Sequence, residues 1–279
     1  MIEISHIVVD GCSLTYCQGL EKPHIDGWPA LLAKRIGVPV INLALGGSGN
    51  DGIQRRTFNY VYKSLDYYKN NNIDSNPFYI IGLTWAGRRE EYFENYYHWT
   101  DTNRYYTLDL TPDMDKLLQI IDNHETDKKS KAAYVEYAYL LNFDLEAAHL
   151  KKLHHWASLV NLFKVNNINY GIGDYIPTYD EDILYKTRTI YKPLSDFLYD
   201  DKNNFGEFAS VTRNSDKLPC QHDGIESQKI LADYVYNKII EVHGNIVVTT
   251  VSNLYKLKQF YFSEPHGNHA VVSDWYLNL

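Results

Sequence analysis

Near its start the chain reads Ile7-Val8-Val9-Asp10-Gly11-Cys12-Ser13-Leu14-Thr15-Tyr16, an apolar run that stops at a glycine and is followed by a serine. A short run rich in β-branched residues and ended by glycine is typical of a buried strand in a parallel sheet. A serine at the carboxyl end of such a strand lies where open α/β sheets bind ligands. Serine is also a common helix N-cap, so this stretch alone leaves Ser13 with a functional and a capping interpretation.

Downstream of this strand, helical and strand patterns alternate. The apolar periodicity predicts helices over residues 28–36, about 53–69, 144–165 and 226–242, and strands over 38–45, 77–84 and 169–177. Alternation with short glycine-bearing turns predicts a parallel sheet with helices on both faces, a three-layer α/β/α fold. We expect one domain over residues 1–244, with an insertion at about 91–143, and a β-rich C-terminal extension over 245–279.

Composition narrows the class of protein. The net charge of -8 over 279 residues argues against a general nucleic-acid binder, because neutralising phosphates needs a basic surface. No apolar run approaches the roughly 20 residues of a membrane span, and the first residues lack the pattern of a secretion signal. Three cysteines without a CxxC pair suggest neither a disulfide framework nor a zinc site. We therefore expect a cytoplasmic protein, in a host cell or in a particle assembled there.

Two further features have open interpretations. The 25 tyrosines suit a sugar-binding or protein-binding surface, although an AT-rich genome would also raise this count. His149, His154 and His155 fall in one predicted helix, but their spacing places no ligand pair on one face. We expect them at solvent or at an interface, and we expect no metal.

A glycine cluster, Gly46-Gly47-Ser48-Gly49-Asn50-Asp51-Gly52, follows the second predicted strand. Glycines let backbone N–H groups approach a ligand closely before a helix begins. The segment has neither the Walker ending nor the order of a dinucleotide site. A flexible connection between strand and helix is the alternative interpretation.

Three blocks together resemble the SGNH (GDSL-like) hydrolases, in particular small members encoded by tailed bacteriophages. The first block, at residues 11–15, is similar to the family's Gly-Asp-Ser-Leu/Phe-Thr, with Cys12 in place of the aspartate. The second, at 40–47, ends on Gly47, and the last begins at His222. The resemblance covers about residues 4–86 and 168–242 and implies a flavodoxin-like sheet.

The resemblance implies acyl transfer. Ser13 would attack an ester carbonyl, His222 would take its proton, and the backbone N–H groups of Ser13 and Gly47 would hold the oxyanion. The expected substrate is a small ester or an O-acetylated glycan, with Trp85 and Arg88 in contact with it. This chemistry needs no cofactor.

Two family residues are missing. The turn that should supply an asparagine reads Thr84-Trp85-Ala86-Gly87-Arg88, so Asn50, Arg88 or Arg89 is expected to donate instead. The aspartate expected three residues before His222 is Pro219, which leaves Asp223, Asp216 or a backbone carbonyl to orient the imidazole.

These departures keep two alternatives open. Cys12 is a second candidate nucleophile, although the family match favours Ser13. The whole chain could instead be a catalytically weakened structural or binding protein of a phage particle, which uses its C-terminal extension for self-association or as a virion component.

Overall fold

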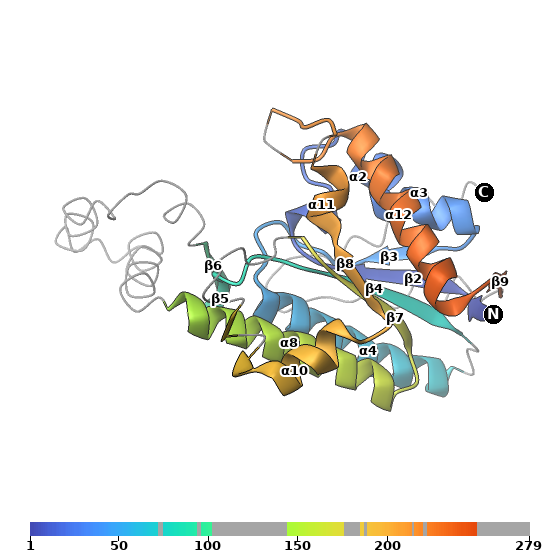
Figure 1. Cartoon of the computed structure of the whole chain (residues 1–279). Coiled ribbons are helices and arrows are strands. Elements are labelled where there is room, and N and C mark those ends of the chain that lie inside the picture. Colours follow the sequence, from blue (N-terminus) through green and yellow to red (C-terminus); the bar gives the residue numbers. More distant parts are fainter. Residues whose placement is uncertain are drawn as a thin grey trace.

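The computed structural model describes residues 1–71, 75–93, 96–101, 144–175, 185–186, 189–213, 215–219 and 222–249. Its centre is a five-stranded parallel sheet in the order β3-β2-β4-β7-β8 (Figure 1). The strands are β2 (His6–Asp10), β3 (Val40–Asn42), β4 (Pro77–Leu83), β7 (Asn169–Asp174) and β8 (Asn204–Glu207). In chain order this is 2-1-3-4-5, the flavodoxin-like order. The predicted fold class is confirmed.

Helices cover both faces of the sheet (Figure 1). One face is covered by α4 (Asn50–Asn70), α8 (Leu145–Val165) and α10 (Lys192–Tyr199). The other is covered by α3 (Trp28–Ile36), α11 (Phe208–Thr212) and α12 (Ile225–His243), while the short α1 (Ser13–Tyr16) and α2 (Pro23–Asp26) join β2 to α3. The helix predicted from about residue 53 begins earlier, at Asn50, because the extended Gly49 is its N-cap.

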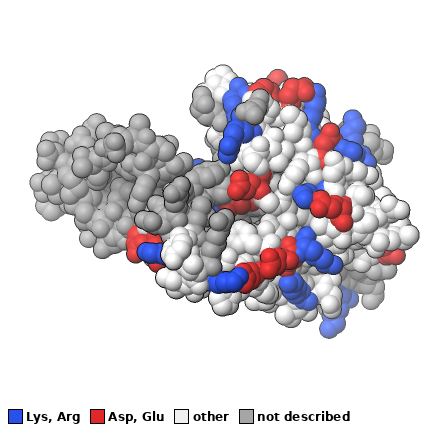
Figure 2. All heavy atoms as spheres, viewed as in Figure 1, with Lys and Arg blue, Asp and Glu red and all other residues white. Residues whose placement is uncertain are grey.

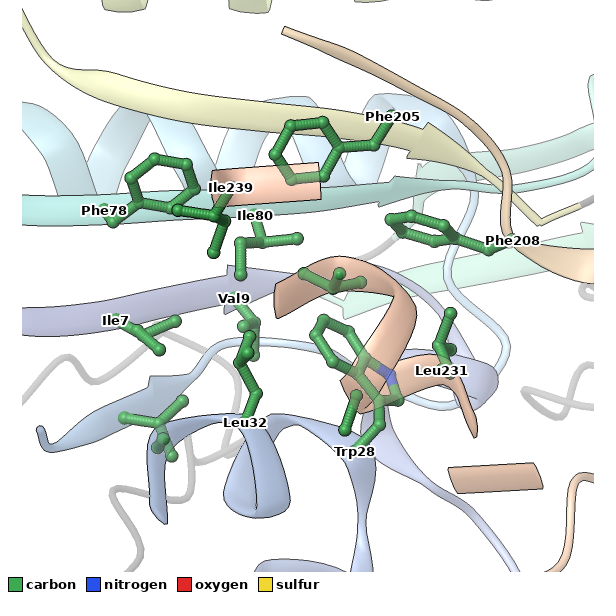
Figure 3. Close-up of a cluster of buried hydrophobic side chains, with 14 of the residues drawn as sticks. Ile7, Val9, Trp28, Leu32, Phe78, Ile80, Phe205, Phe208, Leu231 and Ile239 are labelled. Atoms are coloured by element: carbon green, nitrogen blue, oxygen red, sulfur yellow. The ribbon is translucent and has the colours of Figure 1, made fainter. Parts of the chain in front are cut away.

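Both faces of the sheet are buried, as the continuous apolar run of β2 predicts. Val8 packs toward α4 and α8, whereas Ile7 and Val9 pack toward α3 and α12. Figure 3 shows the second cluster, which includes Ile7, Val9, Trp28, Leu32, Phe78, Ile80, Phe205, Phe208, Leu231 and Ile239. This packing fixes the carboxyl end of β2, where the serine turn begins.

Two small sheets flank the main one. β1 (Ile2–Ile4) pairs in parallel with β9 (Ile246–Val248), and β5 (Arg88–Phe93) pairs antiparallel with β6 (Tyr96–Asp101). The start of the predicted C-terminal extension is thus a strand against the N-terminus. Residues 102–143 of the insertion and 250–279 of the extension lie outside the described residues, and the domain boundaries stay a prediction.

One prediction on α8 is wrong. His149 was expected at solvent or at an interface, but it is only 4% exposed. The reason is that α8 packs against both α4 and α10, which gives it a wide buried face. Burial, with a smaller contribution from the charge of Lys152, lowers the pKa of His149 to about 4.

Charges of both signs are interspersed with uncharged side chains on the face in Figure 2. No helix within the described residues combines the length and the apolar character that a membrane span needs. The expectations about nucleic acid, membranes, oligomers and location stay predictions.

Candidate active site

The strand order places the candidate site. β2 connects to β3 on one side and pairs with β4 on the other, so the order reverses between β2 and β4. Ligands of open α/β sheets bind at this switch point, outside the carboxyl ends of the strands. Ser13 lies three residues after β2, and Thr84 follows β4 directly. The serine singled out by the sequence is therefore at the expected edge of the sheet.

A tight turn presents Ser13. Cys12 is the N-cap of α1 and Ser13 is its first residue, so the capping interpretation of Ser13 is wrong. A Cβ on Gly11 would lie 2.1 Å from Thr15 Oγ1, which explains why a glycine is needed before the turn. Ser13 as a residue is 6% exposed. As the first helical residue, its N–H has no partner within the helix.

Cys12 points the other way. Its side chain is wholly buried in the cluster formed with Trp28 and Leu32, under α3. A side chain inside the core cannot reach a substrate at the sheet edge. Of the two candidate nucleophiles, Ser13 is the one that the turn places next to the switch point.

The glycine-rich segment forms the neighbouring loop. Gly47 has a φ of 79°, in the left-handed region that glycine adopts without strain. The loop is tied to the serine turn, because the Leu45 N–H donates to the Gly11 carbonyl at 3.2 Å. Gly47 therefore lies on a loop that is hydrogen-bonded to the segment preceding Ser13.

Asn50 fastens the same loop to the end of β4. Its Nδ2 donates to the carbonyls of Thr84 at 3.1 Å and Trp85 at 3.4 Å, and its Oδ1 accepts from the Thr84 N–H at 2.9 Å. The carboxamide is thus engaged with backbone groups. To serve as an oxyanion donor, Asn50 has to give up one of these hydrogen bonds, and that role stays a prediction.

A buried ion pair joins Asp10, which precedes the turn with Ser13, to Arg56 of α4. The sequence patterns did not predict this pair. Arg56 Nη2 lies 2.7 Å from Asp10 Oδ1, and Thr57 Oγ1 donates to Asp10 Oδ2 at 3.0 Å. Burial raises the pKa of Asp10 to about 6, against the opposing effects of Arg56, the Gly11 N–H and Thr57. The available signal was a carboxylate at the end of a fully apolar strand, which requires a buried partner.

His222 lies in the segment that leads into α12, and its side chain is half-buried. The carboxylate of Asp223 pairs with Lys217 and accepts from the Thr212 hydroxyl at 3.1 Å. The carboxylate of Asp216 accepts from the Ser227 N–H at 2.8 Å, at the N-terminus of α12. Hydrogen bonds from backbone and hydroxyl groups lower the pKa of Asp216, although burial alone would raise it.

Gln228 connects the segment that contains His222 to α1, the helix that begins at Ser13. Its Oε1 accepts from Cys17 Sγ at 3.3 Å and from the Trp28 N–H at 3.0 Å. Its Nε2 donates to the carbonyl of Asp223, the neighbour of His222, at 3.2 Å. Cys17 directly follows α1, so one buried side chain holds the predicted base and nucleophile segments together.

The two candidate carboxylates near His222 have other partners. The carboxylate of Asp216 is engaged with Ser227, and that of Asp223 with Lys217 and Thr212. Hydrogen bonds between catalytic groups are often long before substrate binds. The catalytic assignments stay predictions.

Trp85 and Arg88 lie beside the glycine-rich loop. The Arg88 N–H donates to the Trp85 carbonyl at 3.1 Å, and Arg88 Nη1 donates to Thr84 Oγ1 at 3.3 Å. A Cβ on Gly49 would lie 2.8 Å from the Arg88 carbonyl oxygen, so the two backbones touch. Both predicted substrate contacts are thus at the carboxyl end of β4, whereas the side chain of Arg89 lies outside the described residues.

No model of a known protein family matches the sequence, and no curated protein matches it. Among solved structures, the chain is similar to the psychrotrophic esterase EstA from Pseudoalteromonas sp., with 16% identity, a TM-score of 0.48, and coverage of 86% of this chain and 100% of that one. A putative lipolytic protein of the G-D-S-L family from Desulfitobacterium hafniense has 14% identity, a TM-score of 0.45, and coverage of 84% and 99%.

A family 2 carbohydrate esterase from Corynascus thermopiles has 13% identity, a TM-score of 0.47, and coverage of 86% and 67%. These three neighbours are two esterases and a lipolytic protein by name. At these identities the likeness concerns the fold alone, and the fold assignment rests on the strand order described above.

Proposed function

We propose that the protein is a serine ester hydrolase that works by acyl transfer at Ser13. The observation that supports this best is the convergence of three segments at the switch point. The turn with Ser13, the loop with Gly47 and the segment with His222 are joined by the Leu45–Gly11 and Gln228 hydrogen bonds. These are the parts that a serine nucleophile, an oxyanion site and a general base require.

The reaction then proceeds in two steps. Ser13 Oγ attacks the ester carbonyl as His222 takes its proton, and the oxyanion accepts from the N–H groups of Ser13 and Gly47. The C–O bond to the alcohol breaks as His222 returns the proton to the leaving oxygen. Water, deprotonated by His222, hydrolyses the acyl-enzyme in the same way.

A sequence departure sets the expected rate. Pro219 stands where the family has its orienting aspartate, and loss of such a carboxylate costs about 10⁴-fold in kcat in serine hydrolases. The oxyanion donors and substrate binding still leave catalysis above the uncatalysed reaction. We expect a slow enzyme.

The substrate that fits best is a small acyl ester, with an O-acetylated glycan as the natural form. Ser13 is nearly buried, which favours an acyl group as small as acetyl. Trp85, half-buried at the same edge, offers an aromatic ring against which a sugar can pack.

The test is hydrolysis of a chromogenic acetyl ester by the wild-type protein and by Ser13→Ala and His222→Ala variants with native circular dichroism. A phosphonate that labels active serines, located by mass spectrometry, reports on Ser13 without turnover. We expect turnover to disappear in both variants and the label to fall on Ser13. Unchanged hydrolysis by folded Ser13→Ala contradicts the proposal.

A second candidate function is a catalytically weakened binding or structural protein, such as a component of a phage particle. What favours it is that the turn at residues 84–88 contains no asparagine and that Asp216 and Asp223 are engaged with other groups. Absence of both turnover and labelling, combined with binding of an acetylated glycan that is left intact, favours this function.

A further inference from the structure

We propose that Arg56 is a positioning residue that sets the spacing between the two oxyanion donors, because its guanidinium holds both loops that carry them. The inference rests on the proposed function, since it concerns the same backbone N–H groups of Ser13 and Gly47. The contacts of the Arg56 side chain are with Asp10, Gly11 and Ser48, so it acts through the loops.

The contacts of Arg56 reach both loops. Nη2 donates to the Gly11 carbonyl at 3.1 Å, two residues before Ser13. Nη1 donates to Ser48 Oγ at 2.6 Å, one residue after Gly47. A single planar group therefore links the serine turn to the glycine-rich loop.

Asp10 fixes the guanidinium in turn. Asp10 Oδ1 accepts from Arg56 Nη2 at 2.7 Å and from Nε at 3.3 Å, and also from the Gly11 N–H at 2.7 Å. Asp10 is the last residue of β2, so its carboxylate holds Arg56 in a fixed position relative to the sheet that positions Ser13. Arg56 is 3% exposed and Asp10 is not exposed, so neither group moves freely.

The Asp10–Arg56 pair is explained better by the geometry that it imposes on its neighbours than by a gain in folding stability. A buried ion pair gives little net stability over well-packed apolar side chains, because both charges are removed from water. A guanidinium, however, offers five N–H donors in a rigid plane, which fixes several acceptors relative to one another. A lysine ammonium has no such fixed directions.

The glycine-rich loop needs this support. Glycine permits many backbone conformations, so the left-handed Gly47 has little intrinsic preference for the one observed. Asn50 anchors the far end of the loop at Thr84, and Ser48 is where Arg56 holds its middle. Without the Ser48 contact, the Gly47 N–H is held by the Asn50 anchor three residues further on and by two backbone hydrogen bonds of 3.2 Å, from the Ser48 N–H to the Leu45 carbonyl and from the Leu45 N–H to the Gly11 carbonyl.

Two variants test this. Ser48→Ala removes only the loop end of the link, and Arg56→Lys keeps a positive charge beside Asp10 but loses the planar donors. Ser64→Ala is the matched control, because Ser64 is equally buried and its hydroxyl donates to a backbone carbonyl, that of Val61, at 2.9 Å.

The measurements are kcat and KM for the acetyl ester, and amide hydrogen exchange of the peptide covering residues 43–50. We expect Ser48→Ala and Arg56→Lys to lower kcat about tenfold or more, with KM changed less than about twofold, since a charge-assisted hydrogen bond is lost. Exchange in the peptide should rise about tenfold. Ser64→Ala should change neither quantity more than about twofold.

The outcomes separate the two proposals. Unchanged exchange and kcat in Ser48→Ala overturn the role of Arg56, and so does faster exchange with unchanged kcat. If the wild-type protein hydrolyses no ester, the proposed function fails, while exchange alone decides whether Arg56 holds the loop. Should Arg56→Lys fail to fold, Ser48→Ala decides, because it leaves the ion pair intact.

Discussion

The ring of His6 gives a prediction about stability and pH. His6 begins β2 and has no exposed surface; its Nδ1 lies 3.0 Å from the Ser5 hydroxyl and its Nε2 lies 3.2 Å from the Tyr68 hydroxyl. Burial lowers the pKa of His6 from 6.5 to about 3. The folded protein therefore keeps this ring neutral at pH values where the unfolded chain protonates it.

The sign follows from proton linkage. Between pH 6.5 and 3 the unfolded state binds the proton and the folded state does not, so the free energy of unfolding falls as the pH falls. One pKa unit corresponds to about 1.4 kcal/mol, and the His6 effect reaches about 2 kcal/mol at pH 5. Above pH 6.5 the ring is neutral in both states, so His6 causes no loss of stability there.

Other buried groups also change stability in this range. Burial lowers the pKa of His149 and of His155 to about 4, which adds to the loss on acidification. Asp10 acts in the opposite direction. Its pKa of about 6 in the folded state means that it takes up a proton on acidification before the unfolded chain does. A comparison with a His6 variant isolates the contribution of His6 from the others.

The assay is urea unfolding at pH 7.5 and pH 5 of the wild-type protein and of His6→Gln, whose amide can still meet Tyr68. We expect the variant to be less stable at pH 7.5, because ring packing is lost. At pH 5 the difference should narrow by about 2 kcal/mol, since glutamine does not titrate. Ser64→Ala, a buried change without a titrating group, should differ from wild type equally at both pH values. An equal difference for His6→Gln at both pH values would refute the reasoning.

Three substitutions test the site. Gly11→Ala forces a Cβ to 2.1 Å from Thr15 Oγ1, so the free energy of unfolding in urea should fall by about 1–3 kcal/mol and ester hydrolysis should also fall. Normal stability and activity of this variant argue against the tight turn. Cys12→Ala should retain ester hydrolysis, because the thiol is in the core, and loss of activity in a folded variant contradicts this placement of Cys12. Asp216→Ala should lower stability by about 1 kcal/mol through loss of the α12 cap, with kcat changed less than about tenfold; a fall near 10⁴-fold shows instead that Asp216 orients His222.

Local sequence patterns account for several elements of the fold. The β-branched run Ile7-Val8-Val9 predicts β2, and Gly37, which adopts a φ of 87°, ends α3 where the pattern places its C-terminus. Asp144 caps α8 with its carboxylate, which accepts from the Glu146 N–H at 2.9 Å. Such features depend on neighbours within a few residues, so the sequence carries them directly.

The sequence does not show which distant residues pair with one another. The pairing of β1 with β9 joins the two ends of the described chain, and Asp10 meets Arg56 of α4, 46 residues further along. Asp216 was a candidate partner of His222 by proximity in sequence, yet its carboxylate accepts from the start of α12. A charge in a pattern shows only that a partner is required, and many distant residues satisfy that requirement equally well.

The sequence by itself determined the alternation of the first strands and helices, the parallel sheet and the position of Ser13 after a buried strand, because hydrophobic period and turn residues act locally; it did not predict β8, α10 or α11. Only the tertiary structure decided which side chains support that serine. Arg56 and Gln228 reach the site from helices whose approach is set by packing on opposite faces of the sheet. Packing brings together residues far apart in the chain, and no local pattern specifies which ones will meet.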